Sequence, residues 1–359
     1  LKYVSIRNAG DEIEEANELN CLTLAGVGDA TEISYVECQS NWDDGFEWFG
    51  GTVGADHLAS YWIGDDSFDL DQGYTGIGQF WHAIQTTFNA DNGSSFGSGS
   101  GDRAGEWDGE DFGERGEDVN YRIEGAQQRP WPQSNPLVYN LTVQGTSSPG
   151  TNPATSPAGD NRGVFMRNGY AGALWNAIIV NTGTRECFEV EASGAANFTA
   201  ADNAAAGSLV VGTTTCDGTA GISGAAETAA TNGDAERCAR GALPCAQTPT
   251  AAHFQSENII EGSSWSTSTA AAFAGLAQDV TAVEPKGDGA NKIALGMLSP
   301  SAGGPIDPRP VGAVGVAGAV IPSPAGTVDS AATYRGAFPA GVSPWTGFTS
   351  LSVGGILLP

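Results

Sequence analysis

A short strand-like motif recurs along the first half of this chain, and it constrains the fold more than any other feature. The motif is an apolar or small residue, any residue, then Tyr, His or Asn, then an apolar or small residue. Its copies begin at Leu1, Ile33, Ala55, Phe80, Val138 and Leu174, and the first four starts are 32, 22 and 25 residues apart. Periods of about 20–50 residues indicate a solenoid. Short strands with Gly-rich corners and no helical crossovers favour a β-solenoid.

A second, sharper repeat brings acidic residues into register. Residues 42–47 (WDDGFE) and 64–69 (GDDSFD) match at a spacing of 22 residues. If one coil has this length, matching side chains stack one rung apart, at about 4.8 Å. The stacked pairs are then Asp43 with Asp65, Asp44 with Asp66, Phe46 with Phe68, and Glu47 with Asp69. The two Phe side chains are expected inside the coils.

The stacked carboxylates form a candidate cation site. Like charges at 4 Å repel by roughly 4 kcal/mol at an effective dielectric of ~20, so the carboxylates must protonate, move apart or bind a cation. Oxygen ligands favour Ca²⁺ over transition metals. The predicted calcium ligands are Asp43, Asp44, Glu47, Asp65, Asp66, Asp69 and Asp71. The alternative is that these residues hydrogen-bond the backbone at turns. No organic cofactor is predicted.

Aromatic and imidazole side chains accompany the acidic coils. Five tryptophans lie within or beside them, namely Trp42, Trp48, Trp62, Trp81 and Trp107. Aromatic platforms beside carboxylates suit sugar binding, whereas the commoner role of such residues is to fill the interior. His57 and His82 both fall on the Tyr/His/Asn position of the motif, which favours a stacked ladder of planar side chains over catalysis.

Charge and cysteine content indicate the environment of the protein. The 359 residues include 15 Lys and Arg against 42 Asp and Glu, a formal net charge of -27, which argues against nucleic acid and anionic membranes as partners. No apolar run approaches the ~20 residues of a membrane helix. The chain has neither an initiator Met nor a signal peptide, and we expect a processed, exported product. The even set of cysteines suits disulfides, with free cytosolic thiols as the alternative: Cys21, Cys38, Cys187, Cys216, Cys238 and Cys245.

Composition divides the chain into three parts. Residues 1–195 are expected to form the coils, with a long loop at about 88–134. Residues 196–260 are rich in Ala, Thr and Gly and contain three cysteines, which predicts a disulfide-stapled insertion. Residues 261–359 are predicted to be an irregular segment that packs on the solenoid, with a short helix within Thr267–Val280.

Several segments together resemble a family of largely uncharacterised bacterial secreted or cell-surface proteins, many of which carry a C-terminal sorting signal. The segments are 1–10, 17–28, 33–36, 43–53, 64–71, 334–338 and 345–348. The resemblance implies a right-handed parallel β-helix, an exported location and no established reaction.

Two departures from that family carry further predictions. Family members usually have Gly after the segment that corresponds to Glu18–Asn20, whereas this chain has Cys21, with Cys38 one coil later. We therefore expect a Cys21–Cys38 disulfide that typical members lack. Members also have coils before the segment that corresponds to Leu1–Gly10. An uncovered first coil is an aggregation template, so we expect copies of this chain or another surface protein to cover the N-terminal edge.

The predicted function is a non-catalytic structural or adhesive component of the cell surface or extracellular space, stabilised by calcium and part of a larger assembly. The alternative is a carbohydrate-binding or carbohydrate-active β-helix, similar to a polysaccharide lyase or hydrolase, with glycans as partners. Paired carboxylates can hydrolyse glycosides. A lyase also needs a base, however, and no Lys or Arg lies between Arg7 and Arg103.

Overall fold

The computed structural model describes residues 1–14, 17–85, 102–108, 134, 136–144, 162–167, 173–180, 188–190, 259–261, 306–309, 327–339, 341–342 and 344–357. Four of the cysteines, Cys187, Cys216, Cys238 and Cys245, lie outside these residues, as does the helix expected within Thr267–Val280.

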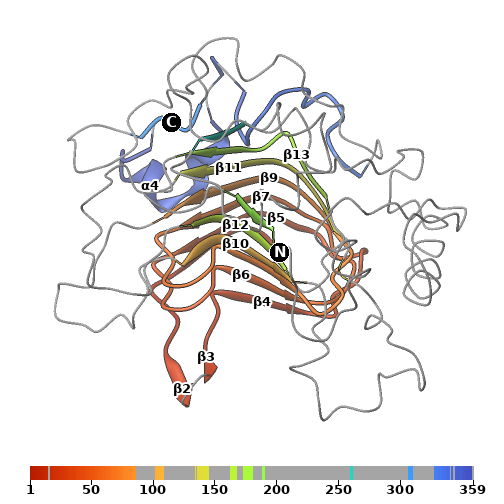
Figure 1. Cartoon of the computed structure of the whole chain (residues 1–359). Coiled ribbons are helices and arrows are strands. Elements are labelled where there is room, and N and C mark those ends of the chain that lie inside the picture. The colour runs from red at the N-terminus through yellow and green to blue at the C-terminus, as the bar shows by residue number, and fades with distance from the viewer. Residues whose placement is uncertain are drawn as a thin grey trace, which may run out of the picture.

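The described strands form two stacked parallel sheets (Figure 1). The long sheet contains β1 (Lys2–Arg7), β5 (Ile33–Gln39), β7 (Ala55–Tyr61), β9 (Ile77–Ile84), β11 (Leu137–Gln144), β13 (Ala173–Trp175), β14 (Ile178–Val180) and β16 (Ile259–Glu261). The short sheet contains β4 (Leu22–Ala25), β6 (Phe46–Phe49), β8 (Phe68–Asp71), β10 (Arg103–Asp108), β12 (Arg162–Arg167) and β15 (Phe188–Val190). A small antiparallel hairpin, β2 (Glu12–Glu14) and β3 (Asn17–Glu18), projects from the first coil. Near the C-terminus lie η5 (Trp345–Phe348) and α4 (Ser350–Val353).

The chain passes alternately through the two sheets, so each coil adds one rung to both. In the long sheet β5 pairs in parallel with β7, and in the short sheet β6 pairs in parallel with β8. The register places Phe46 opposite Phe68 and Glu47 opposite Asp69, which confirms the 22-residue coil. The protein is therefore an all-β parallel β-helix, as predicted.

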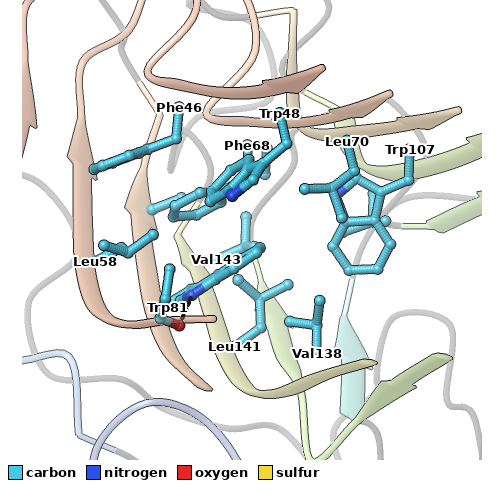
Figure 2. Close-up of a cluster of buried hydrophobic side chains, with 14 of the residues drawn as sticks. Phe46, Trp48, Leu58, Phe68, Leu70, Trp81, Trp107, Val138, Leu141 and Val143 are labelled. Carbon is cyan, nitrogen blue, oxygen red and sulfur yellow. Dashed lines mark hydrogen bonds between the residues drawn. The ribbon is translucent and has the colours of Figure 1, made fainter. Parts of the chain in front are cut away.

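Large aromatic side chains fill the space between the sheets (Figure 2). Trp48 of the short sheet stacks on Trp81 of the long sheet with 5.1 Å between ring centroids, and Phe46 stacks on Phe68 at 5.6 Å. All four side chains are completely buried. Burial of each contributes on the order of 2–3 kcal/mol. Because side chains alternate along a strand, the carboxylates between these residues face outward.

A ladder of left-handed residues bends the long sheet. At one position per coil a residue other than Gly adopts φ between +53° and +59°, namely Tyr3, Tyr35, His57, Phe80, Asn140 and Asn176. The rings of Tyr35 and His57 stack with 4.2 Å between centroids, and those of Tyr3 and Tyr35 with 4.8 Å. In the last of these coils Asn176 lies between β13 and β14, so the bend divides the long-sheet strand into two there.

The predicted place of His82 in this ladder is wrong. His57 does belong to it, but Phe80 takes the position in the next coil. The register aligns Asp56 with Gln79 rather than with Trp81, so the motif in this coil begins two residues before the predicted start, at Gly78. A side chain at residue 78 would lie 2.3 Å from the Trp81 ring. Glycine at this position leaves space for the indole ring. The start of the motif in this coil is not recognisable from the sequence.

The expected loop at 88–134 is also corrected by the structure, because it contains strand β10. Glu106 and Trp107 of this strand pair with Asp69 and Leu70 of β8. Trp107 is therefore a completely buried core residue.

The described C-terminal residues cover the outer face of the long sheet. Ile306, Leu351 and Leu357 pack against Ala59, Tyr61 and Ile84. Two hydrogen bonds join this cover to the long sheet. The Gly336 N–H donates to the Asn176 carbonyl (2.7 Å), and the Ala337 N–H donates to Thr142 Oγ1 (2.8 Å).

The predicted disulfide between Cys21 and Cys38 is present, and it links the residue just before β4 to strand β5 across a sequence separation of 17. A loop of this length restricts the unfolded chain enough to contribute about 3 kcal/mol. Within the described parts of the chain, no helix has the length and apolarity required to cross a bilayer.

Candidate cation site

An acidic ladder follows the outer face of the short sheet. Strand pairing aligns Glu47 with Asp69 and Asp69 with Glu106, so three consecutive coils each present a carboxylate at the same position. Glu47 is only 9% exposed and Glu106 only 8%. The parallel pairing holds these groups one rung apart, at a separation where charged carboxylates repel.

The turn before each strand adds a second acidic column. Asp44 Oδ1 accepts the backbone N–H of Asp66 at 2.9 Å, and Asp66 Oδ1 accepts that of Arg103 at 2.7 Å. Each carboxylate therefore ties its own coil to the next, which was the alternative interpretation of these residues. In each of these two carboxylates Oδ1 accepts a backbone N–H, and Oδ2 takes no part in these two hydrogen bonds.

Arg103 ends this column with a positive charge. Its Nη1 lies 2.6 Å from Asp102 Oδ2 and 2.5 Å from Glu106 Oε2. Among the described residues no ion pair links Asp44, Glu47 or Asp69 to a basic side chain. Among the described ion pairs, these three carboxylates thus lack the close basic partner that Glu106 has in the next coil.

The carboxylate oxygens meet in three overlapping groups. Oxygens within 4.8 Å of one another come from Asp43, Asp44 and Asp65, from Asp44, Glu47 and Asp69, and from Asp65, Asp66 and Asp102. Two ligands on opposite sides of a calcium ion, each at about 2.4 Å, are about 4.8 Å apart. Each group is compact enough to surround one such ion.

Burial and mutual repulsion raise the pKa values of five of these acids, namely Asp44, Glu47, Asp65, Asp66 and Asp69. Desolvation, followed by repulsion from Asp43 and Asp71, raises the pKa of Glu47 to about 8. Desolvation, followed by repulsion from Asp44 and Glu47, raises the pKa of Asp69 well above its usual value. Asn20 Nδ2 donates a hydrogen bond to Glu47 Oε2, while Asp69 Oδ1 is buried without a hydrogen-bond partner. Without a bound cation, the fully charged state of Glu47 and Asp69 is therefore unfavourable.

The structure groups six of the seven predicted ligands and separates the seventh. Asp71 belongs to none of the three groups, and its Oδ1 accepts the N–H of Gln72 at 2.5 Å. Sequence reasoning missed Asp102 because the fourth coil is longer than 22 residues. The pairing of Asp69 with Glu106 spans 37 residues, so the periodic signal ends before it reaches this strand.

Three of the five tryptophans have the commoner of the two roles weighed for them, which is to fill the interior rather than to form a surface platform for sugars. Trp48, Trp81 and Trp107 are completely buried in the interior, where they serve as core. Trp42 and Trp62 are half-buried, and Trp62 packs against the C-terminal cover.

Fold and site together define a parallel β-helix with a partly buried acidic ladder on one outer face. Residues 1–241 match the model of a family described as a pectate-lyase-like β-helix domain, and the chain belongs to this family. No curated protein and no solved structure matched the chain.

Proposed function

We propose that this protein is a non-catalytic, calcium-stabilised β-helix with a structural or adhesive role outside the cell. The observation that carries the proposal is the group formed by Asp44, Glu47 and Asp69, whose oxygens lie within 4.8 Å of one another on two adjacent coils. The buried Asp69 Oδ1 has no hydrogen-bond partner, and a bound cation would coordinate this oxygen.

Calcium fits this group better than other common cations. All donors are carboxylate oxygens, which disfavours transition metals. Mg²⁺ requires near-octahedral geometry and keeps several waters, whereas Ca²⁺ accepts irregular sets of six to eight oxygens. Asp43 and Asp65 border the same group and extend the set of available ligands.

Two observations support a location outside the cell. The Cys21–Cys38 disulfide is of a kind that persists in oxidising compartments. A net charge of -27 with few Lys residues keeps a protein soluble and discourages binding to nucleic acid.

The alternative is a carbohydrate-active β-helix, and membership of a pectate-lyase-like family favours it. A lyase of that kind handles an anionic substrate with basic residues. Here Arg103, the basic residue at the ladder, contacts Asp102 and Glu106. Release of unsaturated products from polygalacturonate, followed by ultraviolet absorbance, distinguishes the two functions.

The calcium proposal is tested by the double variant Asp44→Asn with Asp69→Asn. Asn at residue 44 still accepts the Asp66 N–H, so the backbone tie survives while the charges are lost. At a calcium concentration of about 100 times Kd we expect Tm of the wild type to rise by about 5 °C over its value in chelator. The double variant should show a clearly smaller rise, because only the group of Asp65, Asp66 and Asp102 is left intact.

Asp11→Asn is the matched control, because it removes an exposed charge beside the β2–β3 hairpin, away from the ladder. It should retain the full calcium response. Terbium luminescence sensitised by the neighbouring Trp48 reports binding directly. An equal response of wild type and double variant would overturn the assignment of these ligands. Assembly with copies of this chain stays a prediction, and native mass with and without chelator measures it.

A further inference from the structure

A groove of about 530 Å³ lies away from the acidic ladder, where the chain passes from the short sheet to the long sheet. It crosses the starts of strands β5, β7 and β9 and is bordered on one side by residues 327–329 of the C-terminal segment. It is therefore built from three successive coils and a fourth, distant piece of chain.

The C-terminal wall of the groove is held firmly in place. Gln79 of β9 is 4% exposed, and its Oε1 accepts the Asp329 N–H at 2.7 Å while its Nε2 donates to the Asp329 carbonyl at 3.1 Å. Val328 packs beside Ile77 in the same apolar cluster. The groove is thus preformed, which lowers the entropic cost of binding.

The polar lining of the groove is acidic. Four acidic residues line it, Asp29, Glu32, Asp56 and Asp329, and none of the described residues that line it is Lys or Arg. Lys2 forms an ion pair with Glu32 at 2.7 Å, and His57 Nδ1 hydrogen-bonds Asp56. Asp29 and Asp329 have no basic partner among the described ion pairs. The acidic lining therefore disfavours a polyanion such as polygalacturonate and favours a cationic ligand.

The remaining lining suits a sugar more than a simple cation. Hydroxyl groups come from Thr31, Thr52, Thr75 and Thr327, and apolar surface comes from Ile33, Ile77 and Phe80. Sugar rings combine an apolar face with a hydroxyl rim, and binding sites match this with apolar walls and a few polar groups. Thr52 and Thr75 belong to successive coils, because the Thr75 N–H bonds the Gly51 carbonyl one rung away. The groove thus offers similar groups at a regular translation of about 4.8 Å.

We propose that this groove binds a cationic oligosaccharide built from amino sugars. The ammonium groups would meet Asp56 and Asp329, and the hydroxyl groups would meet the threonines. The proposal is independent of calcium binding at the acidic ladder, which lies on a different face.

The test uses three hexasaccharides and isothermal titration calorimetry on the full chain. β-1,4-linked glucosamine hexamer carries the charge, its N-acetylated counterpart has the same backbone without it, and galacturonic acid hexamer is anionic. We expect the glucosamine hexamer to bind with an affinity that falls as salt rises. Binding of the N-acetylated hexamer should be at least about tenfold weaker, and the galacturonic acid hexamer should not bind.

Asp56→Asn with Asp329→Asn should weaken glucosamine hexamer binding about tenfold. Asp11→Asn is the matched control and should leave it unchanged. Circular dichroism and Tm confirm that both variants fold. Absence of glucosamine hexamer binding to the wild type overturns the proposal, as does equal binding of the N-acetylated hexamer. If spermine or a lysine hexapeptide binds as tightly as the glucosamine hexamer, charge alone explains the binding and the sugar assignment is overturned.

Discussion

Residues in the left-handed conformation are usually Gly or Asn, because a Cβ atom crowds the following carbonyl there. This protein places Tyr3, Tyr35, His57 and Phe80 in that conformation in four consecutive coils. Ring stacking through the ladder offsets the backbone cost, since aromatic pairs contribute about 0.5–1.5 kcal/mol beyond burial. Where the stack ends, Asn140 and Asn176 take over the position.

Tyr35 tests this balance, because its ring stacks on both Tyr3 and His57. Tyr35→Val loses both stacks and places a β-branched residue at φ +55°, so we expect it to lower the free energy of unfolding by about 3 kcal/mol. Tyr35→Asn loses the stacks but suits the conformation, and should cost about half as much. Urea unfolding of both variants measures the difference. Equal losses would mean that backbone conformation contributes nothing here.

Five of the six ladder residues were predictable from sequence, and the exception was Phe80. Tyr, His and Asn share a planar side chain, so their recurrence at Tyr3, Tyr35, His57, Asn140 and Asn176 marks the position. In strand β9 the pattern fits two frames, and only the packing of the Trp81 ring over Gly78 decides between them. That contact depends on how the side chains of two residues in one strand pack together, and the periodicity of a sequence carries no information about such packing.

At the scale of elements, the attachment of the C-terminal segment depends on a buried carboxylate of β5. Glu37 is 0% exposed, and its Oε1 accepts the N–H and Oγ–H of Ser350 at the start of α4, both at 2.7 Å. Its Oε2 accepts a hydrogen bond from Ser5 Oγ and lies 3.5 Å from Arg7 Nε. One side chain thus joins β1, β5 and α4.

Glu37→Ala should detach this end of the chain. It leaves buried donors unsatisfied, so we expect a loss of about 3 kcal/mol in the free energy of unfolding and faster hydrogen exchange over residues 350–357. Asp307→Ala is the control, since Asp307 pairs with Arg309 at the surface and its loss should cost less than about 1 kcal/mol. Unchanged exchange at α4 in Glu37→Ala would contradict the assigned role.

Strand β10 shows why element prediction failed in one part of the acidic face. The sequence around Arg103–Asp108 is acidic and Gly-rich, which is typical of a loop. In the structure its Gly105 accommodates Trp107, whose Nε1 would lie 2.7 Å from a Cβ at that glycine. The insertion before the strand shifts the period, so neither spacing nor composition identifies it. The first two acidic coils were predictable because no insertion separates them.

At the scale of the whole molecule, the stacking of the coils brings carboxylates together on one face, where their charges repel. The helix requires every coil to repeat its neighbour at the rung spacing, and the sequence repeats carboxylates at the same places. Burial, followed by repulsion between the stacked carboxylates, raises the pKa values of Asp44, Glu47, Asp66 and Asp69. A cation or a proton must therefore be taken up when the coils stack, and this couples folding to pH.

The coupling predicts that the metal-free protein loses stability as pH rises from about 6 to 8.5. The unfolded chain releases the Glu47 proton near its usual pKa of 4.5, while the folded chain holds it up to about pH 8. The folded state thus binds more protons in this range, so the free energy of unfolding falls with pH and levels off above pH 8. His82, buried with a pKa lowered to about 4, acts in the opposite sense, but its contribution lies mostly below pH 6.5.

Calcium binds the deprotonated carboxylates, so the difference in Tm between calcium and chelator should grow over the same range. Differential scanning fluorimetry at half-unit pH steps measures it, with Asp44→Asn and Asp69→Asn together as the comparison. In that variant both the decline and the calcium response should be reduced, because two buried carboxyl groups whose own pKa values are raised, those of Asp44 and Asp69, no longer titrate or bind the ion. A calcium effect on the wild type that is constant from pH 6 to 8.5 would show that the ion binds elsewhere.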